Sequence, residues 1–335
     1  MGNPVKVGEV AVGGRTWIAP MTGVSDLPFR RAASRLGAPY VATEMVACAE
    51  FSRGRPDVVR RAAVGEGLPL MVVQLVGRDP THIAEGARLA VQAGAQIVDL
   101  NFGCPAKEVT GVLSGSALMR EPDLAARLMA AAVEAVDVPV TVKMRLGWDD
   151  ASKNAPEIAA RAEALGVKAV TVHARTRCQF YKGAARWDEA APVKAAVGIP
   201  VIINGDITCG DSARRALAAS GADAVMVGRG VYGRPWIAAQ IEAALDGRPF
   251  DEPDAEARLA IALGHFRDSL AFYGERLGLK IFRKHLAAYV EQAPWPRSPE
   301  ARREARARLC RLDDPSAVEE ALTRLWRNAT VELAA

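Results

Sequence analysis

Eight short apolar runs rich in β-branched residues recur along the first 245 residues of this 335-residue chain. Glycine or polar residues follow each run, and most runs then lead into an alanine-rich segment with helical spacing, such as DPTHIAEGARLAVQAGAQ. Eight strand–helix units in succession predict a (β/α)8 TIM barrel. An open Rossmann sheet is disfavoured because no G-x-G-x-x-G follows an early strand. The predicted strands are TWIAPM, YVATEMV, LMVVQLVG, IVDLNFG, VTVKMRLG, AVTVHAR, VIINGD and AVMVGRG.

The pattern changes from about Asp251, after the proline-bearing segment DGRPFDEPD. Helical periodicity continues to the end, with little β-branched character. We therefore expect a catalytic barrel over residues 1–245, a linker over 246–250 and an all-α helical domain over 251–335. Between Arg276 and Arg311 ten Lys or Arg residues stand against three Glu. This local excess fits either a solvated helix surface or a nucleic-acid contact.

The composition limits the class of protein. The net charge is only +4, and no uninterrupted apolar run is long enough to span a bilayer. The first residues have no apolar stretch typical of a secretory signal, so we expect a cytoplasmic protein with no membrane partner. The five cysteines and four histidines are scattered, without C-x-x-C spacing, which disfavours a disulfide framework and a structural zinc site. We thus expect no metal, and no feature requires an oligomer.

Polar residues stand at the carboxyl ends of most predicted strands, where a barrel of this kind has its active site. A polar group in an apolar run costs desolvation energy unless it finds a partner, so this many are difficult to explain as isolated core groups. We expect them to converge on one mouth. They include Thr22, Gln74, Asn101, Lys143, Arg145, His173, Asn204, Asp206 and Arg229.

The last two predicted strands end in NGD and GRG. Glycines there let backbone N–H groups approach an anion closely, and these two loops are the common phosphate site of such barrels. Arg229 adds a charged donor. The pair of motifs predicts a phosphorylated ligand.

Lys143 allows two functions. It could form a Schiff base, as in an aldolase. It could instead place a positive charge beside the N1/O2 edge of a flavin. Gln74, Asn101 and His173 offer donors that suit the edges of a flavin and have no evident use in a simple aldolase.

Cys104 lies in the stretch IVDLNFGCPAKEVTG, with no second cysteine nearby. Gly103 and Pro105 predict a turn rather than a packed strand. The thiol could be a buried inert group, a nucleophile activated by a cation, or a general acid. The glycine- and serine-rich segment AKEVTGVLSGSA predicts a mobile loop that closes over a substrate.

A basic stretch with interleaved aromatics, HARTRCQFYKGAARW, suggests an RNA partner. Cations can bind phosphates while aromatic rings stack on bases. The alternative is a surface loop with a structural aromatic plug. FRKHLAAYV repeats the combination in the helical part, with Arg283 and Lys284.

Together these residues resemble the bacterial tRNA-dihydrouridine synthases, most closely the B-type branch. The matching motifs run from IAPMTGVSDLPFRR through VQLVG, NFGCPAKEV, SGSALM, VKMRLGW, HARTRCQFYKG, VIINGDI and GRGVYGRPWI to GERLGLKIFRKHLAAY. The resemblance covers nearly the whole chain. Departures from the family pattern are Phe102 for Met, Ala174 for Gly, and Glu108 with Thr110-Gly111-Val112 for a more basic run.

The resemblance implies an FMN-containing barrel in which Cys104 is the proton donor. It implies flavin contacts from Pro20, Met21, Thr22, Gln74, Lys143, His173, Asn204, Gly205, Asp206, Gly228 and Arg229. Contacts with uracil or tRNA are expected from Asn101, Lys107, Arg145, Arg175, Arg177, Lys182, Arg283 and Lys284.

The predicted activity is reduction of the C5=C6 bond of a D-loop uridine in tRNA to 5,6-dihydrouridine. NADPH, or NADH, would reduce FMN, which passes hydride to C6 while Cys104 protonates C5. The base must leave its stack to reach the barrel. Alternatives are an FMN-barrel reductase of a free pyrimidine, a Lys143 aldolase, and a non-catalytic RNA-binding regulator.

Overall fold

The computed structural model describes the chain except residues 1–3, 64, 66, 295–297 and 333–335. Eight parallel strands form one sheet in the order β3-β10-β9-β8-β7-β6-β5-β4. A parallel bridge between Ile18 and Val41 joins the two ends of this sheet and closes it into a barrel. The predicted TIM-barrel fold is confirmed, and every predicted strand is present. The strands are β3 (Thr16–Ile18), β4 (Ala42–Ala47), β5 (Val72–Val76), β6 (Ile97–Phe102), β7 (Val140–Arg145), β8 (Ala169–His173), β9 (Val201–Asn204) and β10 (Ala224–Val227).

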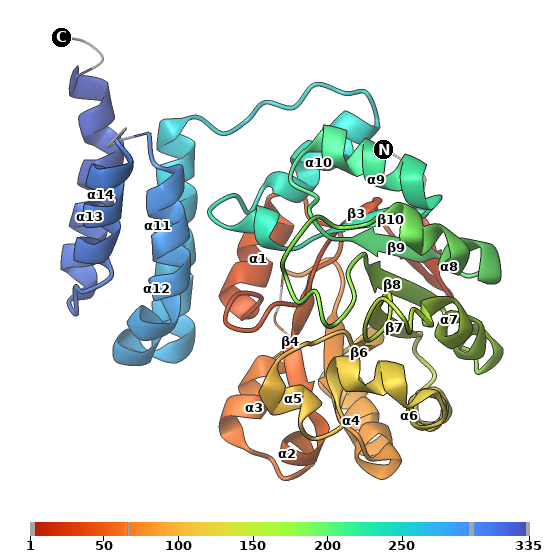
Figure 1. Cartoon of the computed structure of the whole chain (residues 1–335). Coiled ribbons are helices and arrows are strands. Elements are labelled where there is room, and N and C mark those ends of the chain that lie inside the picture. The colour runs from red at the N-terminus through yellow and green to blue at the C-terminus, as the bar shows by residue number, and fades with distance from the viewer. Residues whose placement is uncertain (1–3, 64, 66, 295–297, 333–335) are drawn as a thin grey trace.

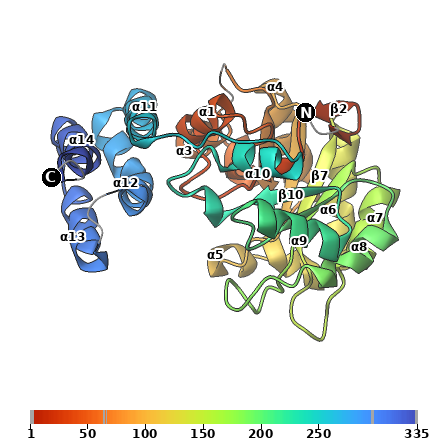
Figure 2. The same cartoon turned by 90° about the horizontal axis from the view of Figure 1, so that it is seen from above.

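Helices surround the barrel (Figures 1 and 2). Helix α4 shows why they form: Asp79 caps its N-terminus by accepting from the backbone N–H groups of Thr81 and His82, and Pro80 fits its first turn. Small residues face the sheet and allow close packing. The helices of this region are α1 (Leu27–Arg35), α2 (Cys48–Ser52), α3 (Pro56–Arg61), α4 (Pro80–Gln92), α5 (Lys107–Thr110), α6 (Pro122–Ala135), α7 (Ala155–Ala164), α8 (Ala191–Ala196), α9 (Gly210–Ser220) and α10 (Ile237–Leu245), with 3-10 turns η1 (Gly115–Arg120), η2 (Asp188–Ala190) and η3 (Arg229–Val231).

A hairpin that the sequence analysis missed covers the amino-terminal end of the barrel. Strands β1 (Val5–Val7) and β2 (Val10–Val12) pair antiparallel across a turn at Gly8. The valines of the hairpin pack against side chains from the beginning of the barrel strands. In the same cluster the rings of Trp17 and Tyr40 stack, with their centroids 4.3 Å apart. Strands of three residues are too short to show a clear alternation, which is why the pattern did not predict them. The hairpin leaves the opposite end open for a site.

Four helices beyond the barrel form a separate layer with its own hydrophobic core, which includes Phe266, Phe282 and Leu286. Figure 1 shows this layer at one side of the barrel, reached by an extended segment that leaves α10. The helices are α11 (Ala255–Tyr273), α12 (Glu275–Gln292), α13 (Pro299–Leu309) and α14 (Pro315–Glu332). Within the described residues, no helix has both the length and the apolar character needed to cross a bilayer.

The helical layer contacts the barrel mainly through α1, which lies between the barrel and α11 (Figure 2). Arg35 on α1 pairs with Asp268 on α11 at 3.0 Å. Lys284 on α12 donates to the Thr22 carbonyl at 3.1 Å, next to the carboxyl end of β3. The helices therefore border the open end of the barrel.

A second contact between the two parts depends on Gly233, which has φ +68. A Cβ atom there would lie 2.5 Å from the carbonyl oxygen of Ala288 on α12. We expect Gly233→Ala to lower the free energy of unfolding by about 2 kcal/mol more than Gly247→Ala does, because overpacking adds to backbone strain. Gly247 is a matched control, with φ +66 and open space around it. Chemical denaturation of both variants measures the difference, and equal losses would show that this close approach is absent in solution.

Candidate active site

A cavity of about 830 Å³ opens at the carboxyl ends of the barrel strands, on the end opposite the hairpin. Cys104 and every residue predicted to contact a flavin line it, so the strand ends converge as expected. The predicted residues lining the cavity are Pro20, Met21, Thr22, Gln74, Asn101, Cys104, Lys143, Arg145, His173, Arg175, Asn204, Gly205, Asp206, Gly228, Arg229 and Lys284.

Four of the predicted RNA-binding residues lie outside this cavity. Lys107 and Lys182 are exposed on the loops that surround it. Arg177 lies over the ring of Trp148, 4.7 Å from its centroid, and donates to the Pro105 carbonyl. Arg283 lines a smaller pocket on α12, together with Arg276, Lys280 and Asp313. These positions are consistent with contacts at the rim rather than with contacts to a base in the cavity.

The sequence analysis did not assign several lining residues to the site. Met45 lies within β4, and the sequence predicts Phe180 and Tyr181 only as aromatics that stack on RNA bases. Tyr232 lies beyond the GRG motif, five residues after the end of β10, so its place at a strand end is not evident from the sequence. Its position after two glycines near a strand end was the only signal available.

A chain of hydrogen bonds fixes the amides on the cavity floor. The Asn101 amide donates to Gln74 Oε1 at 2.8 Å, and Gln74 Nε2 donates to Asp99 Oδ2 at 2.7 Å. Thr141 donates to the other oxygen of Asp99 at 2.7 Å. Burial raises the pKa of Asp99 above its usual range, while these hydrogen bonds oppose the shift. Gln74 and Asn101 are therefore held in fixed orientations, with hydrogen-bonding capacity left for a ligand.

Lys143 is a buried cation on the cavity wall. Its ammonium group donates to Asn204 Oδ1 at 3.1 Å, and the Asn204 amide is itself oriented by a bond to the Met226 carbonyl. Desolvation, together with the charge of Arg145, lowers the pKa of Lys143 to about 8. In the described part of the chain, no carboxylate lies within ion-pair distance of Lys143. Its charge is thus available to an anionic or electron-rich ligand.

Arg145 and Arg175 are almost completely buried, with 1% and 2% of their surfaces exposed. Arg145 donates to the carbonyls of Gly103, Thr176 and Phe180, which ties the cysteine loop to the loop after β8. Arg175 donates to Gly183 and Asp206, both at 2.6 Å. Although both guanidinium groups border the cavity, their donors are used mainly to hold loops. Neither has the exposed surface expected for binding RNA phosphates.

Cys104 sits in a turn built by Asn101. The Asn101 side-chain oxygen accepts from the backbone N–H groups of Gly103 at 3.2 Å and Cys104 at 2.9 Å. Ser116 donates to the Cys104 carbonyl from both its hydroxyl and its backbone N–H. Burial raises the pKa of the Cys104 thiol, although Arg145 and Lys143 oppose the shift. The thiol therefore faces the cavity in its protonated form at neutral pH.

The segment after Cys104 contains more regular secondary structure than the sequence predicts. It forms the short helix α5 and the turn η1, because Cys104 and Ser116 join its two ends. Of the departures from the family pattern, Phe102 and Ala174 are buried, and Glu108 lines the cavity. Glu108 therefore adds a carboxyl group to the lining of the cavity.

Glycine-rich loops after β9 and β10 border one side of the cavity. Gly205 has φ +119, which strongly favours glycine, and a Cβ there would lie 2.9 Å from that of Ala185. The Arg229 side chain is 56% exposed and lies 3.6 Å from Asp206. Burial alone would raise the pKa of Asp206, but hydrogen bonds from Arg175 and Ala185 hold it below its usual value. The half-buried backbone at Gly228 and the exposed guanidinium of Arg229 fit a phosphate group.

Residues 17–326 match the family described as dihydrouridine synthase (Dus). The chain is 52% identical to a probable tRNA-dihydrouridine synthase of Rhodobacter capsulatus, over 90% of this chain and 91% of that protein. It is 41% identical to tRNA-dihydrouridine synthase B of Xanthomonas campestris, over 98% of this chain and 97% of that protein.

Among solved structures, histamine dehydrogenase from Rhizobium sp. 4-9 aligns with a TM-score of 0.57 at 14% identity. The alignment covers 79% of this chain and 50% of that one. The amine oxidase HisD of Pseudomonas geniculata N1 aligns with the same score, over 52% of its length. This chain thus spans about half of each structure, and at this identity the likeness supports the barrel fold alone. The family match and the two tRNA-dihydrouridine synthase relatives show that the chain belongs to the dihydrouridine synthase family.

Proposed function

We propose that this enzyme is an FMN-dependent, NADPH-driven oxidoreductase that reduces a uridine in the tRNA D-loop to 5,6-dihydrouridine. The observation that carries the proposal is the position of Cys104. Its protonated thiol lines a cavity that also contains the buried cation Lys143 and a glycine-rich anion site. We propose that residues 1–245 are the catalytic barrel, 246–250 the linker and 251–335 a helical tRNA-binding domain.

The residues of the cavity fit FMN. Gly205, Gly228 and Arg229 would hold its phosphate, with Asp206 fixing the loop. Pro20, Met21, Thr22 and Asn204 would border the cofactor, while Gln74, Lys143 and His173 would contact the edges of its ring. Bound FMN, reduced by NADPH or NADH, would supply the hydride for C6 of the uracil. His173 is neutral because burial lowers its pKa well below the usual value, so it can accept or donate a hydrogen bond without adding charge.

Cys104 would act as the general acid. A thiol that burial keeps protonated has a proton to give, and the turn built by Asn101 directs it into the cavity. We propose that it protonates C5 of the uracil. The buried position of Arg145, which fixes the Gly103 carbonyl, would keep this turn in place.

The tRNA would approach along α12. Arg276, Lys280 and Lys284 are exposed at intervals of four residues and so form one ridge, and Lys284 reaches the cavity rim. Such a ridge suits a phosphate backbone. Lys107 and Lys182 would add contacts from the barrel loops, and Arg283 would add one from the neighbouring face of α12. Arg175 and Arg177 would act indirectly, by holding the loops that shape the entrance.

The pH dependence of turnover tests the role of Lys143. A lysine with a pKa of about 8 is charged below that pH and neutral above it. We expect turnover to fall as pH rises through about 8, because the cavity loses this charge. In Lys143→Arg this fall in turnover should occur at higher pH, whatever the absolute rate of the variant. Lys194 lies outside the cavity, so Lys194→Arg should leave the pH of the fall unchanged. The rate of dihydrouridine formation from pH 6 to 10 measures this. If turnover of Lys143→Arg falls at the same pH as that of the wild type, another group is responsible for the fall.

The proposed function is tested by recording the visible absorbance of the purified protein. NADPH is then added anaerobically, with and without unmodified tRNA. We expect a yellow protein that bleaches with NADPH and regains colour only with tRNA. Reoxidation by a free pyrimidine would favour a small-molecule reductase. A colourless protein that FMN cannot reconstitute would exclude the flavin chemistry and favour a Schiff base at Lys143.

A non-catalytic RNA-binding role has a different signature. It predicts that tRNA binds but does not reoxidise a reduced flavin, and that no dihydrouridine forms. Mass spectrometry of the nucleosides from the same reaction distinguishes the two.

A further inference from the structure

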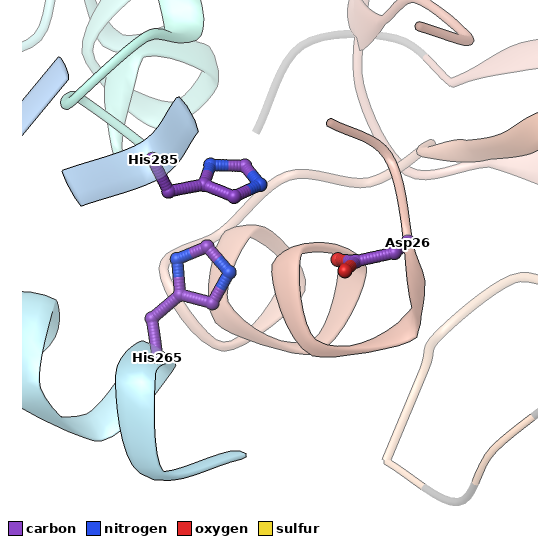
Figure 3. Close-up of side chains that lie close together, drawn as sticks. All are labelled: Asp26, His265 and His285. Carbon is purple, nitrogen blue, oxygen red and sulfur yellow. The ribbon is translucent and has the colours of Figure 1, made fainter. Parts of the chain in front are cut away.

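Three buried polar side chains meet where α1 packs against α11 and α12, and none of them lines the large cavity. Asp26 caps α1, His265 is on α11 and His285 is on α12, with 3%, 2% and 5% of their surfaces exposed. Figure 3 shows the two imidazole rings one above the other, with the Asp26 carboxylate beside them. One ligand atom from each residue lies within 4.8 Å of those from the other two.

Each of these residues has one buried atom without a hydrogen-bond partner among the described residues. The three atoms are Asp26 Oδ2, His265 Nε2 and His285 Nε2. A buried polar atom without a partner is uncommon, and a bound ion or water is a usual explanation. Three such atoms in one cluster indicate a single shared ligand rather than three separate defects.

The other polar atoms of the same side chains are held in place. Tyr289 lies 3.1 Å from His265 Nδ1, and the Val24 backbone hydrogen-bonds to His285. Asp26 Oδ1 accepts from the Phe29 N–H at 3.0 Å, and the Tyr273 hydroxyl also bonds to the Asp26 carboxyl. Histidines that bind metal ions commonly use their second ring nitrogen in this way, which fixes the tautomer and orients the free nitrogen. The cluster therefore has the outer hydrogen bonds of a metal site.

We propose that Asp26, His265 and His285 bind one Zn²⁺ ion that fastens the helical layer to the barrel. Two imidazole nitrogens and a carboxylate are a ligand set that zinc prefers, with a fourth position left for water. Small side-chain rotations would bring the donor atoms to the roughly 3.3 Å separation that tetrahedral bond lengths require. The sequence spacing did not predict this site because Asp26 is more than 200 residues from the two histidines, and the histidines are themselves 20 residues apart.

The surroundings are compatible with a divalent cation. Burial, with the nearby charge of Glu44, raises the pKa of Asp26 to about 7, and a bound divalent cation would favour its carboxylate form. Arg30 is also near, but its guanidinium donates to the Ala63 carbonyl. Burial keeps the pKa values of both histidines low, which leaves the imidazoles neutral, the form that binds metals. The proposal does not depend on the proposed enzymatic function.

The test is the zinc content of the full-length protein, purified without a histidine tag and without chelators. We expect about one zinc ion per chain by elemental mass spectrometry. The double variant His265→Gln/His285→Gln should lose it, whereas His82→Gln, an exposed histidine elsewhere, should retain it. After removal of metal, added Zn²⁺ should raise the Tm of the wild type by several degrees and leave that of the double variant unchanged.

Two outcomes would overturn the proposal. One is a metal-free wild type whose Tm does not respond to Zn²⁺, in which case a buried water shared by the three atoms is the better explanation. The other is a double variant that keeps the same zinc content, which would place the ion elsewhere, for example at the exposed thiols Cys178 and Cys209. If the double variant does not fold, Asp26→Asn takes its place in the test. The asparagine can still cap α1, but the carboxylate that would bind zinc is removed.

Discussion

Cys104→Ala is expected to lower the rate of dihydrouridine formation by about 10²- to 10⁴-fold, the usual contribution of a positioned general acid. The proton for C5 would then have to come from water or from a group that the Asn101 turn does not position, since Cys104 is the only thiol among the described residues that line the cavity. Burial keeps the thiol protonated, so the wild-type enzyme holds the acid ready before the base arrives. Single-turnover reaction of the NADPH-reduced enzyme with unmodified tRNA measures the loss directly.

The same experiment needs controls for folding and binding. The FMN content and the tRNA affinity of Cys104→Ala should be close to those of the wild type, since the hydrogen bonds to Asn101 and Ser116 come from the backbone of Cys104. Cys178→Ala removes an exposed thiol from the loop after β8 and should leave the rate unchanged. Full turnover in Cys104→Ala would contradict the assignment of the proton donor.

Arg175→Met is expected to lower the free energy of unfolding by about 2 kcal/mol, since it removes the buried guanidinium that bonds two carbonyls and the partly exposed Asp206 carboxylate. The groups left without their donor are the Asp206 carboxylate and the carbonyls of Lys182 and Gly183. All three belong to loops that border the cavity. The Tm should therefore fall by several degrees.

Arg161→Met is the matched control for this prediction. Arg161 also forms two ion pairs, with Asp123 and Glu157, but its side chain is 39% exposed. Solvent screens such pairs, so the expected loss is at most about 1 kcal/mol. Arg175→Lys should not restore stability, because an ammonium group cannot reproduce the planar donor geometry of the guanidinium. Equal losses in Arg161→Met and Arg175→Met would show that burial does not strengthen the Arg175 contacts.

The fold could be predicted largely from the sequence. Strands such as VVQLV are buried on both faces and therefore appear as continuous apolar runs, and the alanine-rich segments between them have caps that define their ends. The barrel strands all point the same way, so residues at the ends of distant runs, such as Gln74 and Asn204, meet at one mouth. The short amino-terminal hairpin gave no comparable signal.

The exposure of individual charged residues could not be predicted. Arg175 and Arg177 appear alike in the sequence, but one is buried against Asp206 and the other stacks on Trp148. A run of cationic residues in the sequence suggests an RNA-binding surface. In the structure, some of these residues are buried and hold loops together. Which cations remain available to a polyanion depends on contacts with partners that are distant in sequence.

The sequence by itself determined the barrel, the helical layer after it, the position of Cys104 at the end of β6 and the residues around the cavity. These features follow from local periodicity and from the rule that parallel strands end together. Only the tertiary structure decided which cations are buried, which orientations the amides take, and that Asp26 meets two histidines from another layer. Such contacts join residues far apart in the chain, and their energies depend on burial, which no local pattern specifies.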